Sequence, residues 1–156
     1  MNCDSVLIKT NKDNRCIFEK NDVNLYKELI FKMENLFIEK TTSSPEINFD
    51  PISGICQITG ISMPEDVKII YTPALIWLDD FGKSTHKSIT FNFNFIYFNT
   101  ASSKIILDIL MRLDGLSKLN KEITINWLYK AADLDMEEAV EDYADMISLP
   151  IKLIKL

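Results

Sequence analysis

The segment from Ile89 to Phe95 alternates strictly between apolar and polar residues, reading Ile-Thr-Phe-Asn-Phe-Asn-Phe. Successive side chains of a β-strand point to opposite faces, so three phenylalanine rings would share one face and the polar residues the other. A strand of this kind belongs to a sheet with one face on a core and one open face. We therefore expect a half-buried sheet strand here.

Other segments show a similar alternation. Ile47 and Phe49 alternate with polar residues, and a second alternating run extends from Ile55 to Gly60. Asp50 to Gly54 combines Asp, Pro, Ser and Gly, which favour chain reversal, so a hairpin is predicted. Three further stretches are expected to be extended: Leu36 to Ile38, Ile123 to Trp127, and a terminal edge strand from Ile151 to Leu156.

Between these predicted strands lie segments whose apolar residues have helical spacing. The sequence Ser62-Met63-Pro64-Glu65 fits a capping box and predicts the start of a helix. We expect Pro73 to kink or break that helix and Gly82 to end it. A helix over residues 105–116 follows the cap-forming residues 99–103, and a second capping box at Asp135 to Glu138 predicts the last helix. The expected fold is a single α/β domain with a sheet of about four to six strands and helices mainly on one face.

The 156 residues suit one such domain. Residues 1–32 hold two short apolar runs, 6–8 and 16–18, and a possible helix with Leu25, Tyr26, Leu29 and Ile30 on one face. From residue 33 onward the patterns are clearer. We therefore divide the chain into an extension of unknown role, 1–32, and a domain, 33–156.

Charge and composition exclude several classes of partner. Seventeen basic and 23 acidic side chains give a net charge of −6, and no block rich in Lys or Arg favours nucleic acid. No apolar run approaches the ~20 residues of a membrane span. Cys3, Cys16 and Cys56 have neither disulfide-framework nor zinc-site spacing. A cytoplasmic protein with reduced thiols is expected, binding neither nucleic acid nor membrane.

Catalytic and metal-binding patterns are weak. His86 is the only histidine and lies in a charged turn, and the four glycines match no phosphate-binding loop. Acids concentrate near the last helix: Asp133, Asp135, Glu137, Glu138, Glu141, Asp142 and Asp145. They fit a capped, solvated helix face, docking to a basic partner surface or, least well, a metal site. We expect no metal, cofactor or catalytic residue.

Thr100 lies between a buried-looking strand, which Tyr97-Phe98 follow, and an apolar helix. It fits a simple cap or turn residue, because the first backbone N–H groups of a helix need partners. The same position suits a phosphate: a helix N-terminus stabilises anions, and phosphothreonine carries about −1.5 to −2 charges. Asn99, Ser102 and Ser103 would then shape the surrounding turn.

Several segments resemble one known family. These are Pro45 to Asp50, Gly60 to Glu65, Tyr71-Thr72-Pro73 with Trp77-Leu78, Tyr97 to Lys104, Asn126 to Tyr129, Asp135-Met136, and Glu141-Asp142-Tyr143. In this order they are similar to the SiaC-type regulatory phosphoproteins over roughly residues 34–156. Ala101 and Leu128 depart from that family's usual residues. The expected layout also resembles the STAS-like anti-sigma-factor antagonists, in topology only.

The resemblance implies a bacterial partner-switching protein. Its Thr100 would be phosphorylated by a cognate Ser/Thr kinase and restored by a PP2C-like phosphatase. The unphosphorylated form would bind and activate a diguanylate cyclase, which links the switch to cyclic-di-GMP and biofilm regulation.

We therefore predict a regulator rather than an enzyme, with phosphorylation at Thr100. Two rivals remain: a phosphate-independent binding module that docks through its acidic last helix, and a small hydrolase that uses the hydroxyls between Asn99 and Ser103. The hydrolase would need a nearby base, and none is recognisable. Candidate docking residues are Trp127, Tyr129, Asp135, Glu138, Glu141 and Asp142.

Overall fold

The computed structural model describes residues 33–156. The extension 1–32, with its two apolar runs, its possible helix at Leu25 to Ile30, and Cys3 and Cys16, lies outside the described residues. The described strands are β1 (Leu36–Ile38), β2 (Glu46–Asp50), β3 (Ile55–Ser62), β4 (Ser88–Phe98), β5 (Glu122–Tyr129) and β6 (Ile151–Lys155). The helices are α2 (Val67–Lys83), α3 (Thr100–Lys118) and α4 (Leu134–Met146).

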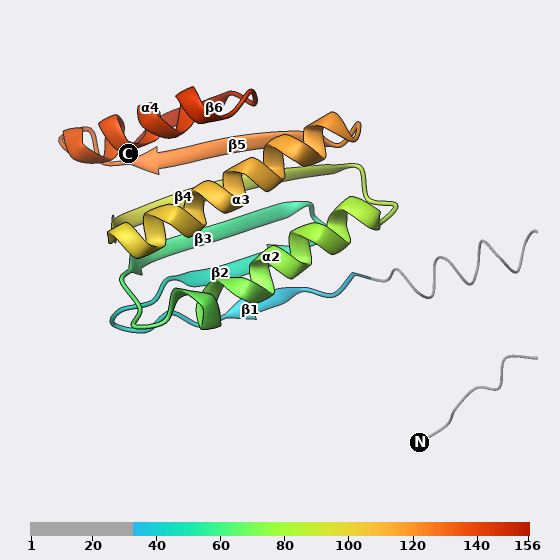
Figure 1. Ribbon diagram of the computed structural model, residues 1–156, viewed down its shortest axis with the longest axis horizontal. Coiled ribbons are helices and arrows are strands. Elements are labelled where there is room, and N and C mark those ends of the chain that lie inside the picture. Colours follow the sequence, from blue (N-terminus) through green and yellow to red (C-terminus); the bar gives the residue numbers. More distant parts are fainter. Residues whose placement is uncertain (1–32) are drawn as a thin grey trace, which may run out of the picture. The chain divides into compact units, whose positions relative to one another are not determined.

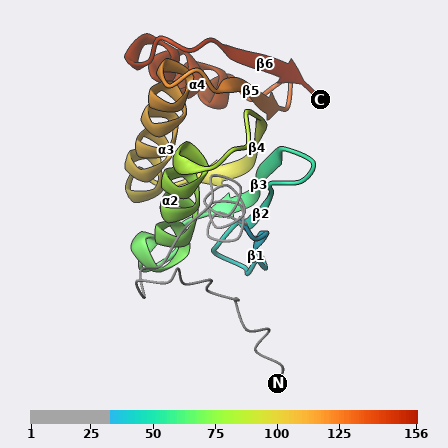
Figure 2. The ribbon, with the colours of Figure 1, turned by 90° about the vertical axis from the view of Figure 1, so that its right-hand side faces the viewer.

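These six strands form one sheet whose spatial order equals their order in the chain (Figure 1). β1, β2 and β3 are antiparallel neighbours, whereas β3, β4, β5 and β6 are parallel. Each parallel pair is joined by a helix, and α2, α3 and α4 lie on one face of the sheet (Figure 2). The predicted α/β sheet with helices on one face is confirmed.

The alternation from Ile89 to Phe95 forms the middle of the core. Phe91 and Phe93 are fully buried and Phe95 nearly so, whereas Asn92 and Asn94 lie on the open face. The Phe93 ring stacks on Trp127 of β5 at 4.7 Å, and Phe91 meets Phe49 of β2 edge-on at 5.1 Å. Aromatic rings of neighbouring strands thus fill the space beneath the helices.

The hairpin between β2 and β3 forms as predicted. Gly54 donates its N–H to the carbonyl of Asp50 at 3.0 Å and has a φ of +69°. A Cβ at this position would meet the carbonyl oxygen of Ser88 at 2.9 Å, so both the backbone conformation and the close approach favour glycine. The short strand β1 and the edge strand β6 also form where they were expected.

The predicted start of α2 is wrong. Ser62 is the last residue of β3, and the helix begins at Val67, with Asp66 accepting a hydrogen bond from the N–H of Lys68. Pro73 neither breaks nor ends the helix. It lacks the N–H that would bind the carbonyl of Ile69, but Ile69 is exposed, so water can reach that side of the helix. The helix ends at Lys83, one residue past the predicted Gly82.

The predicted start of α4 is displaced by two residues. Asp133, not Asp135, is the N-cap, and its carboxylate accepts a hydrogen bond from the N–H of Met136 at 3.0 Å. Acids in several adjacent positions can each cap a helix, so the sequence alone does not decide between them. None of the described helices is long and apolar enough to cross a membrane.

Candidate functional site

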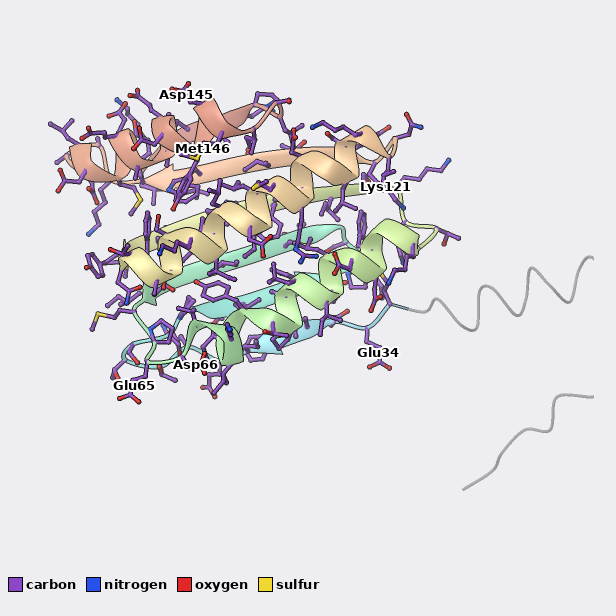
Figure 3. The ribbon with its side chains drawn as sticks, in the orientation of Figure 1. Glu34, Glu65, Asp66, Lys121, Asp145 and Met146 are labelled. Atoms are coloured by element: carbon purple, nitrogen blue, oxygen red, sulfur yellow. The ribbon has the colours of Figure 1, made fainter. Side chains whose placement is uncertain are left out.

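The ends of β3 and β4 lie side by side and lead into the first turn of α3. Ser62 pairs with Phe98, and the N–H of Asn99 donates to the carbonyl of Ser62 at 3.0 Å. Glu65 and Asp66 follow β3 in the chain, and Figure 3 shows them at the end of the sheet where β3 ends. Lys121 lies at the opposite end. Thr100 is therefore presented at the carboxyl ends of the parallel strands.

A β-bulge sets the direction of the chain just before Thr100. Gly60 pairs with Phe95 and Ile61 with Tyr97, so Ile96 is the extra residue of β4. Gly60 has a φ of +111°, a conformation that favours glycine. Ile96 and Tyr97 are both exposed, whereas Phe98 turns toward the core and packs near Tyr143. The bulge thus shifts the alternation by one residue before α3 begins.

Asn99 caps the amino end of α3. Its side-chain Oδ1 accepts the N–H of Ser102 at 2.9 Å, and its carbonyl accepts the N–H of Ser103 at 2.8 Å. Thr100 and Ala101 lie between these anchored residues and are exposed. Within the described part of the chain, no hydrogen-bond acceptor is assigned to the N–H of Thr100 or Ala101. Two backbone donors therefore remain for water or an anion.

Three buried hydroxyl groups support this turn from below. Ser62 Oγ lies 2.6 Å from Tyr71 Oη of α2 and donates to Ser102 Oγ at 2.8 Å. Ser62, Tyr71 and Ser102 are each 0% exposed. Burial raises the pKa of the Tyr71 hydroxyl well above its usual range, so this group stays protonated near neutral pH.

A second hydroxyl contact joins the turn to α4. Ser103 Oγ lies 2.8 Å from Tyr143 Oη, and the Tyr143 hydroxyl also donates to the Ser103 carbonyl at 3.1 Å. Burial raises the pKa of Tyr143 as well. The residues on either side of Thr100 and Ala101 are thus tied to β3 and to α4, while Thr100 itself faces solvent.

The acids of α4 have the exposure that a docking surface requires. Asp135, Glu138, Glu141 and Asp142 are all exposed. The last turn of α4 contains no basic residue. Glu137, on the same helix, pairs with Lys155 of β6 at 3.8 Å. These four residues remain candidate docking residues.

Trp127 and Tyr129 do not belong to that surface. Trp127 is 0% exposed and Tyr129 is 2% exposed, because both point from β5 into the core beneath α3 and α4. Trp127 stacks on Phe93 and lies 5.7 Å from the ring of Tyr143. Their expected role in docking is corrected on this ground: a partner cannot reach them without unfolding the core.

His86, the single histidine of the sequence, lies far from the hydroxyls of the turn. His86 precedes β4, whereas Thr100 follows it, and 11 residues of extended strand separate them. At ~3.3 Å per residue this is more than 30 Å. Among residues 33–156 there is no group of three or more His, Cys, Asp or Glu side chains that could hold a metal ion.

The roles of Ser62, Tyr71 and Tyr143 are not predicted from the sequence. Ser62 was assigned to a helix cap, yet it continues the inward-facing set of β3, which contains Cys56, Ile58 and Gly60. A serine at an inward position of a strand indicates a buried partner for its hydroxyl. Nothing in the sequence identifies that partner, since Ser102 is 40 residues away.

Comparison with known proteins identifies one family. Residues 38–156 match the model of the SiaC family regulatory phosphoproteins. An uncharacterized protein of Pseudomonas aeruginosa strain UCBPP-PA14 is 25% identical over 121 residues, which are 78% of this chain and 96% of the relative.

Solved structures share the fold. The crystal structure of apo-SiaC from Pseudomonas aeruginosa has a TM-score of 0.74 at 24% identity and covers 78% of this chain and 99% of its own. A chain of the crystal structure of diguanylate cyclase SiaD in complex with its activator SiaC, from the same organism, gives the same TM-score, identity and coverage. At this identity, the likeness establishes the architecture.

Proposed function

Because this chain belongs to the SiaC family of regulatory phosphoproteins, we propose that phosphorylation of Thr100 controls its binding to a diguanylate cyclase. The unphosphorylated form binds and activates the cyclase, and the phosphorylated form releases it. A cognate Ser/Thr kinase and a PP2C-like phosphatase set the balance between the two forms. The chain itself acts as a cytoplasmic regulator without catalytic activity.

One observation carries this proposal. Thr100 is an exposed hydroxyl in the first turn of a 19-residue helix, beside two N–H groups that have no acceptor among residues 33–156. A phosphate there gains from those donors and from the positive end of the helix. Exposed Lys104 lies one helical turn later, at a spacing that suits pairing with the phosphate. The modified residue therefore fits without disturbing the fold.

The surroundings of Thr100 explain why a phosphate would change binding. Met63, Ile96 and Tyr97 are exposed by 47%, 63% and 53% at the ends of the same two strands. An apolar partner surface that covers them must also desolvate residue 100. A neutral threonine tolerates this, whereas a phosphate with about −1.5 to −2 charges does not. A difference of ~3 kcal/mol changes affinity about 100-fold.

The cyclase as partner is supported by the family and by the fold. A chain of similar architecture occurs in the complex of the diguanylate cyclase SiaD with its activator SiaC. This likeness at 24% identity supports a partner of the same class. The enzyme's product would be cyclic-di-GMP.

Binding and activation can be measured with full-length protein and purified diguanylate cyclase from the same organism. We compare unmodified protein, protein with phosphothreonine at position 100, and the Thr100→Ala and Thr100→Glu variants. Titration calorimetry gives affinity, and the rate of cyclic-di-GMP synthesis gives activation. We expect phosphothreonine to weaken binding about 100-fold and Thr100→Ala to retain it.

Thr85→Glu is the matched control, because Thr85 is also an exposed threonine but precedes β4. It should change affinity less than twofold. If phosphothreonine at position 100 binds as tightly as threonine, charge at this position is not the switch.

The acidic surface of α4 supports a second candidate function, phosphate-independent docking to a basic partner. Its exposed acids, Glu138, Glu141 and Asp142, can be neutralised together as Glu138→Gln, Glu141→Gln and Asp142→Asn. Loss of cyclase binding in this triple variant, combined with no effect of Thr100 phosphorylation, would favour the second candidate.

A further inference from the structure

We propose that Ser62 is a positioning residue for Thr100, holding the first turn of α3 so that its two backbone donors converge on a phosphate. This inference rests on the proposed phosphorylation of Thr100. It assigns the supporting role to a side chain that never touches the phosphate. Ser62 makes hydrogen bonds with both sides of the turn.

Ser62 anchors the two residues that flank Thr100 and Ala101. Its backbone carbonyl accepts the N–H of Asn99 at 3.0 Å, and its side chain donates to Ser102 Oγ at 2.8 Å. One residue at the end of β3 thus fixes both sides of the exposed pair. The position of the pair follows from these two bonds and from the Asn99 cap.

The contact between Ser62 and Ser102 indicates the direction of hydrogen bonding in this network. A serine hydroxyl can donate one hydrogen bond, and the Ser62 hydroxyl donates it to Ser102 Oγ. The contact between Ser62 and Tyr71, 2.6 Å long, therefore requires Tyr71 to donate. The raised pKa of Tyr71 keeps that proton in place. In this arrangement the donated hydrogen bonds run from α2 through β3 to α3.

Stability alone does not account for three hydroxyls at this place. Each is fully buried next to a core of aliphatic and aromatic side chains. Apolar residues of similar shape can replace a buried hydrogen-bonded pair at little net cost. A satisfied polar network, in contrast, specifies a single geometry. Such a geometry has a use at a turn that must offer two N–H groups to an incoming charge.

The test uses full-length protein with phosphothreonine at position 100 and follows the phosphate by phosphorus NMR during a pH titration. In the wild type, the converging N–H groups stabilise the dianion and lower the pKa of the phosphothreonine below that of a phosphothreonine peptide. Ser62→Ala should raise that pKa, reducing the stabilisation of the dianion about threefold. Tyr71→Phe removes only the first donor of the chain and should act in the same direction, less strongly.

Ser84→Ala is the matched control. Ser84 is a buried serine, 8% exposed, whose hydroxyl donates to the carbonyl of Phe81 at 2.8 Å at the opposite end of β4. Its loss should leave the phosphothreonine titration unchanged. If Ser62→Ala does not fold, Ser102→Ala decides the question, because it removes the acceptor of the same hydrogen bond from Ser62.

The outcomes separate this inference from the proposed function. An identical phosphothreonine pKa in wild type, Ser62→Ala and Tyr71→Phe would overturn the positioning role, even if phosphate still controls cyclase binding. A pKa that rises in both variants supports the positioning role, even if phosphate has no effect on the cyclase. If the pKa rises in both variants but phosphate has no effect on the cyclase, the proposed function is wrong and the positioning role of Ser62 is supported.

Discussion

The two ends of α3 are held in place by different chemistry. At the amino end, neutral hydroxyl groups connect Ser102 to Ser62 and Ser103 to Tyr143. Toward the carboxyl end, the carboxylate of Asp114 accepts hydrogen bonds from Lys118 Nζ at 2.6 Å and from the N–H groups of Ser148 and Leu149 at 3.1 and 2.9 Å. One end uses uncharged contacts, and the other uses a buried charge.

The difference follows from what each end has to do. A carboxylate next to Thr100 would repel a phosphate dianion, whereas hydroxyl groups fix the geometry without adding charge. At the other end, Asp114 ties the segment between α4 and β6 to α3, and charged hydrogen bonds are the stronger kind. Neutral contacts thus suit the amino end of α3, where phosphorylation would add charge at Thr100. A charged contact suits the carboxyl end, where no such change is proposed.

The largest expected effect is at the charged end. Asp114→Ala leaves the N–H groups of Ser148 and Leu149 without their acceptor and should lower the free energy of unfolding by about 2–3 kcal/mol. Asp108→Ala removes another α3 acid, which is more exposed and pairs with Arg112 at 3.5 Å, so a loss of about 0.5 kcal/mol or less is expected. Urea unfolding of both variants measures the difference. Equal losses for the two variants would show that the hydrogen bonds of Asp114 to Ser148 and Leu149 add no stability.

At the neutral end, the expected losses are smaller and unequal. Ser62→Ala leaves the buried Tyr71 hydroxyl without an acceptor and should cost about 2 kcal/mol, whereas Tyr71→Phe leaves no orphan donor and should cost about 1 kcal/mol. Urea unfolding at neutral pH tests this order. A larger loss for Tyr71→Phe would contradict the direction of donation inferred above.

The pH dependence should come from the charged end. The hydrogen bond from Lys118 holds the pKa of Asp114 below its ordinary value of 3.8, against the opposing effect of burial. A lowered pKa in the folded state contributes stability above the ordinary pKa, and this contribution is lost as pH falls through the folded-state value. The stability difference between wild type and Asp114→Asn should therefore shrink below pH 4. Chemical unfolding at several pH values measures it, and a difference that stays constant would exclude the charge as its source.

The smallest expected effect concerns two glycines near the charged end. A Cβ at Gly115 would meet no atom within 4 Å, whereas one at Gly82 would lie 2.9 Å from Cδ2 of Leu116. Gly115→Ala should therefore stabilise the protein by about 0.5–1 kcal/mol through helix propensity. Gly82→Ala should gain less, because Leu116 must move. Thermal unfolding compares the two variants, and an equal gain would show that Leu116 moves freely.

Much of the fold was predictable because local patterns and tertiary packing agree. The alternation around Phe93 and the helical spacing in α3 indicated their elements directly. The start of α2 was mispredicted because Ser62, Pro64 and Glu65 satisfy a helix-start pattern locally. In the folded protein, the Ser62 hydroxyl is committed to tertiary contacts, and Asp66 performs the capping.

The candidate site was predictable only in part. Thr100 and Asn99 are neighbours in sequence, so a strand end followed by cap-forming residues located the turn. The supporting hydroxyls come from residues nine to 40 positions apart, and no local pattern pairs them. The burial of Trp127 had a local indication, because it continues the inward-facing positions of β5, yet it was named as a candidate docking residue.

The order of the strands in the sheet has a consequence for how the chain is made. Each strand pairs with the one synthesised just before it, so a ribosome delivers the sheet from one edge to the other. Ser62 and Tyr71 precede Thr100 in that sequence of events, and Tyr143 follows it. The support from α2 and β3 is thus synthesised before the threonine, and the support from α4 is added last.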